Sequence, residues 1–194
     1  KINYVDVLGD WAEFNSTQDI TNFILGTKAD TLSRLEDIVK KSHIGKQVNF
    51  IVEQWLSNPT SVISQIQQVF GKTKLIVRSS SIAEDNWNSS NAGGFESILN
   101  VSSSDENQLI AAINCVSDSY GEISNPKDQV LIQEFLQDVA MAGVVFTCSI
   151  ETGAPYYRFN FDDSSNSTES VTAGKKAELR TVVVSKCSSE SIMQ

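Results

Sequence analysis

The sequence is poor in the residues that build several common kinds of site. It has 1 histidine, 3 cysteines and 3 prolines in 194 residues. A single histidine, His43, rules out a multi-histidine metal site and a histidine-based catalytic dyad elsewhere in the chain. An odd, widely spaced set of cysteines does not form a disulfide framework. So little proline excludes collagen-like and proline-rich linker classes.

Long apolar runs are missing too. No uncharged apolar run approaches the ~18 residues that a membrane span needs. No basic segment followed by an apolar segment opens the chain, so we predict no secretory signal and a cytoplasmic protein with no membrane partner. In that reducing compartment the cysteines should be buried thiols. They are Cys115, Cys148 and Cys187.

The sequence contains a normal proportion of core-forming residues and more acidic than basic residues. Hydrophobic residues make up 40% and charged residues 20%, which is enough for a folded core. The formal net charge is -9. An acidic surface repels phosphodiester backbones, so we predict no nucleic-acid partner. A locally basic pocket for a small anion is compatible with that balance.

The apolar pattern alternates between helical and strand periodicity. Thr27 and Asp30 have the spacing of a helix N-terminal cap, and Asn58-Pro59 is a second helix start. Two strands separated by a short loop, 129–136 and 143–149, predict a hairpin. We therefore expect a mixed α+β (α/β) fold with at least one antiparallel element. Further helices or strands are expected near 27–39, 48–52, 59–71, 74–78, 95–101, 103–121, 156–161 and 177–185.

Three positions have side chains or backbone suited to an anion. Arg78 ends an apolar strand and opens a serine-rich turn, where a guanidinium could bind phosphate oxygens. A salt bridge to Glu84 or Asp85 is the alternative. Lys28 stands at a helix start, which favours phosphate, although a solvated surface lysine is commoner. Gly93-Gly94 lets backbone amides approach a ligand, or is simply a turn.

Five blocks in order resemble one family. They are 76–85 (IVRSSSIAED), 90–101 (SNAGGFESILNV), 130–136 (VLIQEFL), 142–153 (AGVVFTCSIETG) and the helix start 26–32 (GTKADTL). Together they are similar to the N-terminal domain of phosphoenolpyruvate synthase and pyruvate phosphate dikinase. The resemblance implies an ATP-grasp nucleotide-binding module that binds ATP with Mg²⁺.

The resemblance also implies roles for individual residues. Lys28 and Arg78 would contact the ATP phosphates as catalytic residues. The loop at Gly93 and Gly94 would cover the phosphates. The strand that lines the adenine would contribute Gln133, Glu134 and Phe135. Phosphoryl transfer needs positioning and charge neutralisation, which these residue types supply.

The sequence departs from the family where metal ligands are expected. No segment like the family's later metal-binding block is found, so most Mg²⁺ ligands would lie outside this chain. Asp162 and Asp163 are a tempting pair, but they lie in a Ser/Asn-rich stretch typical of a solvated turn. We therefore expect a single, incomplete module, with a first lobe over 1–128 and an adenine-side segment over 129–194, inactive alone.

Three functions remain open at this point. The leading hypothesis is the ATP-binding portion of an enzyme that phosphorylates pyruvate or another small acceptor. A variant of it is a small-molecule kinase for an amino-acid amide in a surface-sugar pathway. The others are a non-catalytic nucleotide-binding regulatory module and a structural interaction domain in which Lys28 and Arg78 are surface ion pairs.

Overall fold

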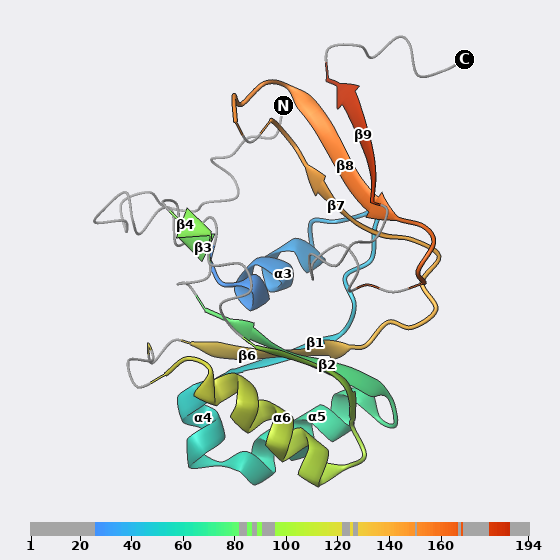
Figure 1. Ribbon diagram of the computed structural model, residues 1–194. Coiled ribbons are helices and arrows are strands. Elements are labelled where there is room, and N and C mark those ends of the chain that lie inside the picture. Colours follow the sequence, from blue (N-terminus) through green and yellow to red (C-terminus); the bar gives the residue numbers. More distant parts are fainter. Residues whose placement is uncertain are drawn as a thin grey trace. The chain divides into compact units, whose positions relative to one another are not determined.

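The computed structural model describes residues 26–81, 85–86, 89–90, 96–121, 125, 128–149, 151–166, 168 and 179–186. The chain forms two compact units, Lys1–Phe135 and Leu136–Gln194 (Figure 1). The predicted functional lobes, 1–128 and 129–194, stay a prediction.

The first unit is built on a four-stranded antiparallel sheet with the order β1-β6-β2-β5. Its two central strands are therefore β6 and β2, which are about fifty residues apart in the chain. The helices of the first unit pack against this sheet. Its strands are β5 (Ser97–Ser102), β1 (Gln47–Ile51), β2 (Lys74–Ser80) and β6 (Gln129–Glu134).

Three helices cover one face of this sheet: α4 (Val52–Ser57), α5 (Pro59–Phe70) and α6 (Glu106–Asp118) (Figure 1). The predicted start of α5 is confirmed, since the Asn58 side chain accepts a hydrogen bond from the backbone of Ser61 and Pro59 takes the first turn. The core between helices and sheet is apolar. Its fully buried members include Ile66, Leu75, Val77, Leu109, Ile113, Val116, Val130 and Ile132.

Helix α3 (Lys28–Glu36) lies on the opposite face of the sheet (Figure 1). Its predicted cap is confirmed, because the Thr27 side chain accepts a hydrogen bond from the Asp30 backbone. The helical spacing of Leu32, Leu35, Ile38 and Val39 in the sequence predicts one apolar face, and this prediction is only partly right. Ala29 is buried, but the helix ends at Glu36, and Leu35 and Ile38 are 36% and 55% exposed.

The second unit contains a three-stranded antiparallel sheet of β7 (Ala142–Phe146), β8 (Tyr156–Asp162) and β9 (Arg180–Ser185). The predicted hairpin between 129–136 and 143–149 is wrong. Strand β6 pairs with β1 and β2, and β7 pairs with β8. Proximity in sequence favoured the hairpin, but three buried residues of β6 in a row require a central place in the first sheet.

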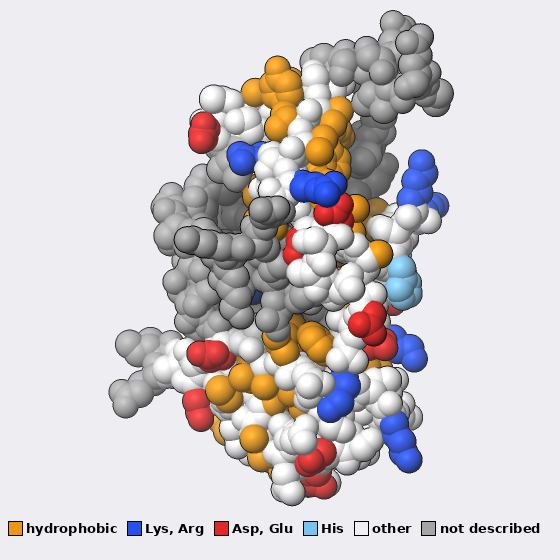
Figure 2. Space-filling view, turned by 45° about the vertical axis from the view of Figure 1, so that its right-hand side comes forward, with side chains coloured by type: hydrophobic (Ala, Val, Ile, Leu, Met, Phe, Trp, Pro, Cys, Tyr) orange, Lys and Arg blue, Asp and Glu red, His pale blue; other side chains and the backbone are white. Residues whose placement is uncertain are grey.

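Side chains on the three-stranded sheet are largely open to solvent, and hydrophobic ones gather along it (Figure 2). The exposed ones include Val145, Tyr156, Val182 and Val183. A short two-stranded ladder, β3 (Asp85–Asn86) with β4 (Ser89–Ser90), completes the described strands. The mixed α+β fold with antiparallel sheets is thus as predicted.

Two smaller expectations concern cysteines and membranes. The prediction of buried thiols is wrong for Cys115 and Cys148, which are free and exposed. Cys115 falls on the outer side of α6, and Cys148 follows β7. Cys187 lies outside the described residues. Among the helices that the structure describes, none has the length and apolar character needed to cross a membrane.

Candidate functional site

A pocket of about 460 Å³ opens between the first turn of α3 and the sheet, within the first unit. It brings together the two cationic residues singled out from the sequence, Lys28 and Arg78. The remaining lining is small, hydroxylic or apolar. The full lining is Gly26, Thr27, Lys28, Thr31, Leu32, Arg78 and Leu131.

Arg78 lies inside β2 and not at its end, since the strand continues to Ser80. Its neighbours Val77 and Ser79 are buried toward the helices, so strand alternation places Arg78 on the α3 side, opposite Leu131 of β6. The side chain is half-buried. Its Nε atom is buried and has no hydrogen-bond partner among the described residues.

An unpartnered buried donor is unusual, because such groups lose their hydration without compensation. The alternative prediction for Arg78 is a salt bridge to Glu84 or Asp85. No ion pair joins Arg78 to a residue that the structure describes, while Glu84 and the side chain of Asp85 lie outside the described part. Arg78 also lines the pocket, where its guanidinium could bind an anion.

Lys28 is the first residue of α3, and a hydrogen-bond network fixes that turn to the sheet. The Thr27 hydroxyl donates to Gln129 Oε1 at 2.8 Å, and Gln129 Nε2 donates to Asp30 Oδ1 at 3.2 Å. The Ala29 amide donates to Ser80 Oγ at 3.0 Å in a buried position. The helix start that carries Lys28 is thus attached to both central strands.

Tyr120 supports the same corner from the other side of the sheet. Its buried hydroxyl accepts from the Ser80 amide at 2.8 Å and donates to the Gln129 carbonyl. Ser80 and Gln129 are register partners in β2 and β6. The hydroxyl therefore bridges the two strands at the residues whose side chains hold α3. The sequence predicted an element near 103–121, which includes Tyr120, but did not predict this role.

The predicted adenine-side residues lie at the end of β6. Gln133 alternates with Leu131, so it belongs to the α3 side of the sheet, next to Ile76 of β2. Glu134 is exposed. The Phe135 amide already donates to the Lys74 carbonyl at 2.8 Å, so only its carbonyl is left for a ligand. Gly93 and Gly94 lie outside the described residues.

Asp162 is the last residue of β8 and Asp163 begins the turn that follows, and this turn is not simply solvated. Asp162 is 3% exposed, and its carboxylate accepts from the amides and hydroxyls of Ser164 and Ser165. Asp163 pairs with Arg180 at 3.1 Å. Within the part of the chain that the structure describes, no group of three or more His, Cys, Asp or Glu could hold a metal.

The role of this turn predicts unequal effects of two neighbouring substitutions. Asp162→Ala should reduce the opening free energy of the β8–β9 amides by about 2–3 kcal/mol, because the amides and hydroxyls of Ser164 and Ser165 lose a buried, charged acceptor. Asp163→Ala removes a partly exposed ion pair and should change the opening free energy by less than about 1 kcal/mol. Native-state hydrogen exchange measures both locally. Equal effects would contradict a structural role for Asp162.

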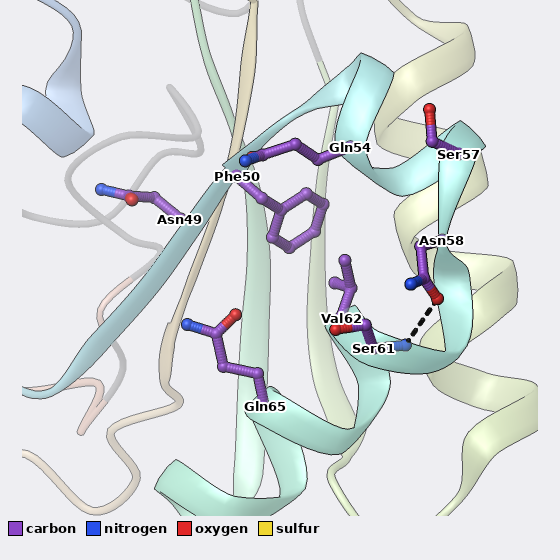
Figure 3. A pocket seen from close by; sticks show the side chains of 8 residues that line it. All are labelled: Asn49, Phe50, Gln54, Ser57, Asn58, Ser61, Val62 and Gln65. Carbon is purple, nitrogen blue, oxygen red and sulfur yellow. Dashed lines mark hydrogen bonds between the residues drawn. The ribbon is translucent and has the colours of Figure 1, made fainter.

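A second pocket, of about 400 Å³, lies where β1 meets α4 and α5 (Figure 3). Its lining is uncharged: Asn49, Phe50, Gln54, Ser57, Asn58, Ser61, Val62 and Gln65. Two of its carboxamide oxygens are engaged, since Gln54 accepts from the Ile51 amide and Asn58 from the Ser61 amide. Without a cation it is poorly suited to a phosphate, and the first pocket is the better candidate.

The fold and the first pocket are consistent with an ATP-grasp-like nucleotide-binding module. The model of the family described as pyruvate phosphate dikinase, AMP/ATP-binding domain, matches residues 19–175. The chain therefore belongs to that family, as its motifs predicted, and is the ATP/AMP-binding part of an enzyme of the pyruvate phosphate dikinase type. A comparison with curated protein sequences gives no match.

Proposed function

We propose that this chain supplies the ATP site of an ATP-dependent phosphotransferase and that Lys28 and Arg78 bind the nucleotide's phosphates. The observation that carries the proposal is their meeting in one pocket from elements fifty residues apart. The buried Nε of Arg78, which has no hydrogen-bond partner in the part of the chain that the structure describes, supports it further. Family membership supplies the class of ligand, since the domain is one that binds AMP or ATP.

The chemistry of these two side chains matches the ligand. A guanidinium offers a planar fork of donors to phosphate oxygens, while an ammonium acts as a compact positive charge. Phosphoryl transfer needs such charges held in place more than it needs a protein nucleophile. The strand and the anchored helix turn supply that positioning. In a protein of net charge -9, two cations in one pocket favour a local anion.

The base of the nucleotide would lie toward the end of β6. Gln133 is on the same face of the sheet as Arg78, and we propose that it contacts the adenine with its carboxamide. Glu134 and the Phe135 carbonyl would contribute at the strand end. The loop at Gly93 and Gly94 would close over the phosphates with its backbone amides.

The phosphoryl acceptor would be pyruvate or another small molecule, an amino-acid amide being the second candidate. Mg²⁺ would enter bound to the ATP phosphates, with its protein ligands mostly outside this chain. We propose that the enzyme works in the cytoplasm. We expect no turnover by this chain alone, and steady release of ADP above a blank would contradict that expectation.

The phosphate assignment predicts a specific loss in Lys28→Ala. Its affinity for Mg-ATP should fall about tenfold or more, because one charge-assisted contact to a phosphate is lost. Its affinity for tripolyphosphate, which lacks the base and ribose, should fall by the same factor. Isothermal titration calorimetry measures both ligands. Lys72→Ala is the matched control, because Lys72 is exposed in the loop after α5.

The outcomes separate the candidate functions. Equal ATP affinity in Lys28→Ala and wild type would remove Lys28 from the site. Binding of ATP that disappears in Lys28→Ala, without phosphoryl transfer by the complete natural protein to any acceptor, would favour the regulatory module instead. A folded wild type that binds neither ATP nor tripolyphosphate would contradict the proposed function of this chain.

A further inference from the structure

A second unpartnered polar atom lies on the α3 side of the sheet. The Gln47 side chain on β1 donates from Nε2 to Ser33 Oγ of α3 at 2.7 Å. Its Oε1 atom is buried and accepts no hydrogen bond from the described residues. The carboxamide is thus held at one end and leaves a desolvated acceptor at the other. Such an atom carries a free-energy penalty that a ligand donor could remove.

The register of the strands places this acceptor relative to Arg78. Gln47 is opposite Gln133 of β6, which is opposite Ile76 of β2, and Arg78 follows two residues later. Strand geometry therefore separates Gln47 from Arg78 by about 7 Å along the strands and about 10 Å across two strand spacings. That separation is within the span of a nucleotide whose phosphates lie at Arg78.

We propose that Gln47 determines the base specificity of the nucleotide site, its buried Oε1 accepting a hydrogen bond from the exocyclic amino group of adenine. The proposal rests on the proposed function, because it assumes that the phosphates lie at Lys28 and Arg78. Carboxamides pair well with adenine, whose edge combines an amino donor with ring-nitrogen acceptors. Gln133, the register partner of Gln47, offers a second carboxamide at the same place.

The orientation of the Gln47 carboxamide determines whether the site prefers adenine or a base with a carbonyl oxygen. Hypoxanthine and guanine carry a carbonyl oxygen where adenine carries its amino group. That oxygen would meet Oε1 as acceptor against acceptor, leaving both without a donor. A site that hydrogen-bonds one group discriminates strongly against an analogue that lacks it. If Nε2 pointed inward instead, the preference would reverse toward the carbonyl bases.

The test compares ATP with inosine triphosphate, which differs at this position by having a carbonyl. Calorimetry on the wild type should show ATP binding about tenfold tighter than inosine triphosphate. Gln47→Met keeps the length of the side chain and removes its acceptor. That variant should bind the two nucleotides within about twofold of each other, with unchanged affinity for tripolyphosphate. Gln68→Met, on the exposed side of α5, should retain the wild-type ratio.

Several results would overturn the inference. One is a wild type that binds both nucleotides equally or prefers inosine triphosphate, a result that needs no variant. Another is a Gln47→Met protein that keeps the tenfold preference. A loss of tripolyphosphate affinity in Gln47→Met would assign Gln47 a structural role in positioning α3. A wild type that binds none of the three ligands contradicts the proposed function itself, and the inference with it.

Discussion

An Arg78→Met variant is expected to bind Mg-ATP about 100-fold more weakly than the wild type while remaining at least as stable. The loss of affinity follows from removing a desolvated guanidinium whose hydrogen bonds to phosphate are charge-assisted. The stability follows from the same burial. The Nε of Arg78 is buried and has no hydrogen-bond partner among the described residues, so its removal relieves an uncompensated desolvation.

Calorimetric titration and urea unfolding on the same samples measure the two halves of this prediction. Lys72→Met is the control for losing a positive charge, and we expect it to change neither quantity appreciably. If the free energy of unfolding of Arg78→Met is lower than that of the wild type by more than about 1 kcal/mol, Arg78 has a structural partner. Unchanged ATP affinity would remove it from the phosphate site. Opposite effects on binding and stability are typical of a residue retained for function.

Tyr120→Phe is expected to lower the free energy of unfolding of the first unit by about 2 kcal/mol. The substitution leaves the Ser80 amide and the Gln129 carbonyl without the hydroxyl that joins them. Both groups are in the central strands, where replacement by water is hindered. Because the side chains of Ser80 and Gln129 also hold α3, the start of that helix should exchange its amides faster.

Urea unfolding followed by tryptophan fluorescence measures this effect, since the buried Trp55 reports on the first unit. Tyr157→Phe is the matched control. Tyr157 is 38% exposed on β8, and its ring contact with Lys186 survives the loss of the hydroxyl. A Tyr120→Phe protein as stable as the control would mean that the bridge contributes nothing beyond what the strands already provide.

Local signals in the sequence predicted most of the elements of this fold. Caps at Thr27 and Asn58 marked helix starts, and apolar spacing identified α5 and α6. The hairpin prediction failed because β6 pairs with β1, about eighty residues earlier in the chain. No local pattern encodes such a partner. The exposure of Leu35 on α3 and of Ile38 just after it was missed for the same reason, since apolar periodicity identifies a helix face but not the element that covers it.

Only part of the candidate site could be predicted from the sequence. Lys28 and Arg78 were found by residue type and by resemblance, whereas their common pocket depends on the docking of α3 against β2 and β6. The sequence did not indicate a role for Gln47, because a polar residue that alternates with Val48 in a strand is expected to face solvent. Its buried oxygen emerges only once α3 lies over that side of the sheet.

The central claim is that ATP places its phosphates between Lys28 and Arg78. The most direct test is a calorimetric titration of Mg-ATP into the wild type and into the double variant Lys28→Ala/Arg78→Met. We predict that the wild type binds one ATP per chain and that the folded double variant shows no measurable binding. Equal ATP affinity in the two proteins would contradict the claim and place the nucleotide elsewhere.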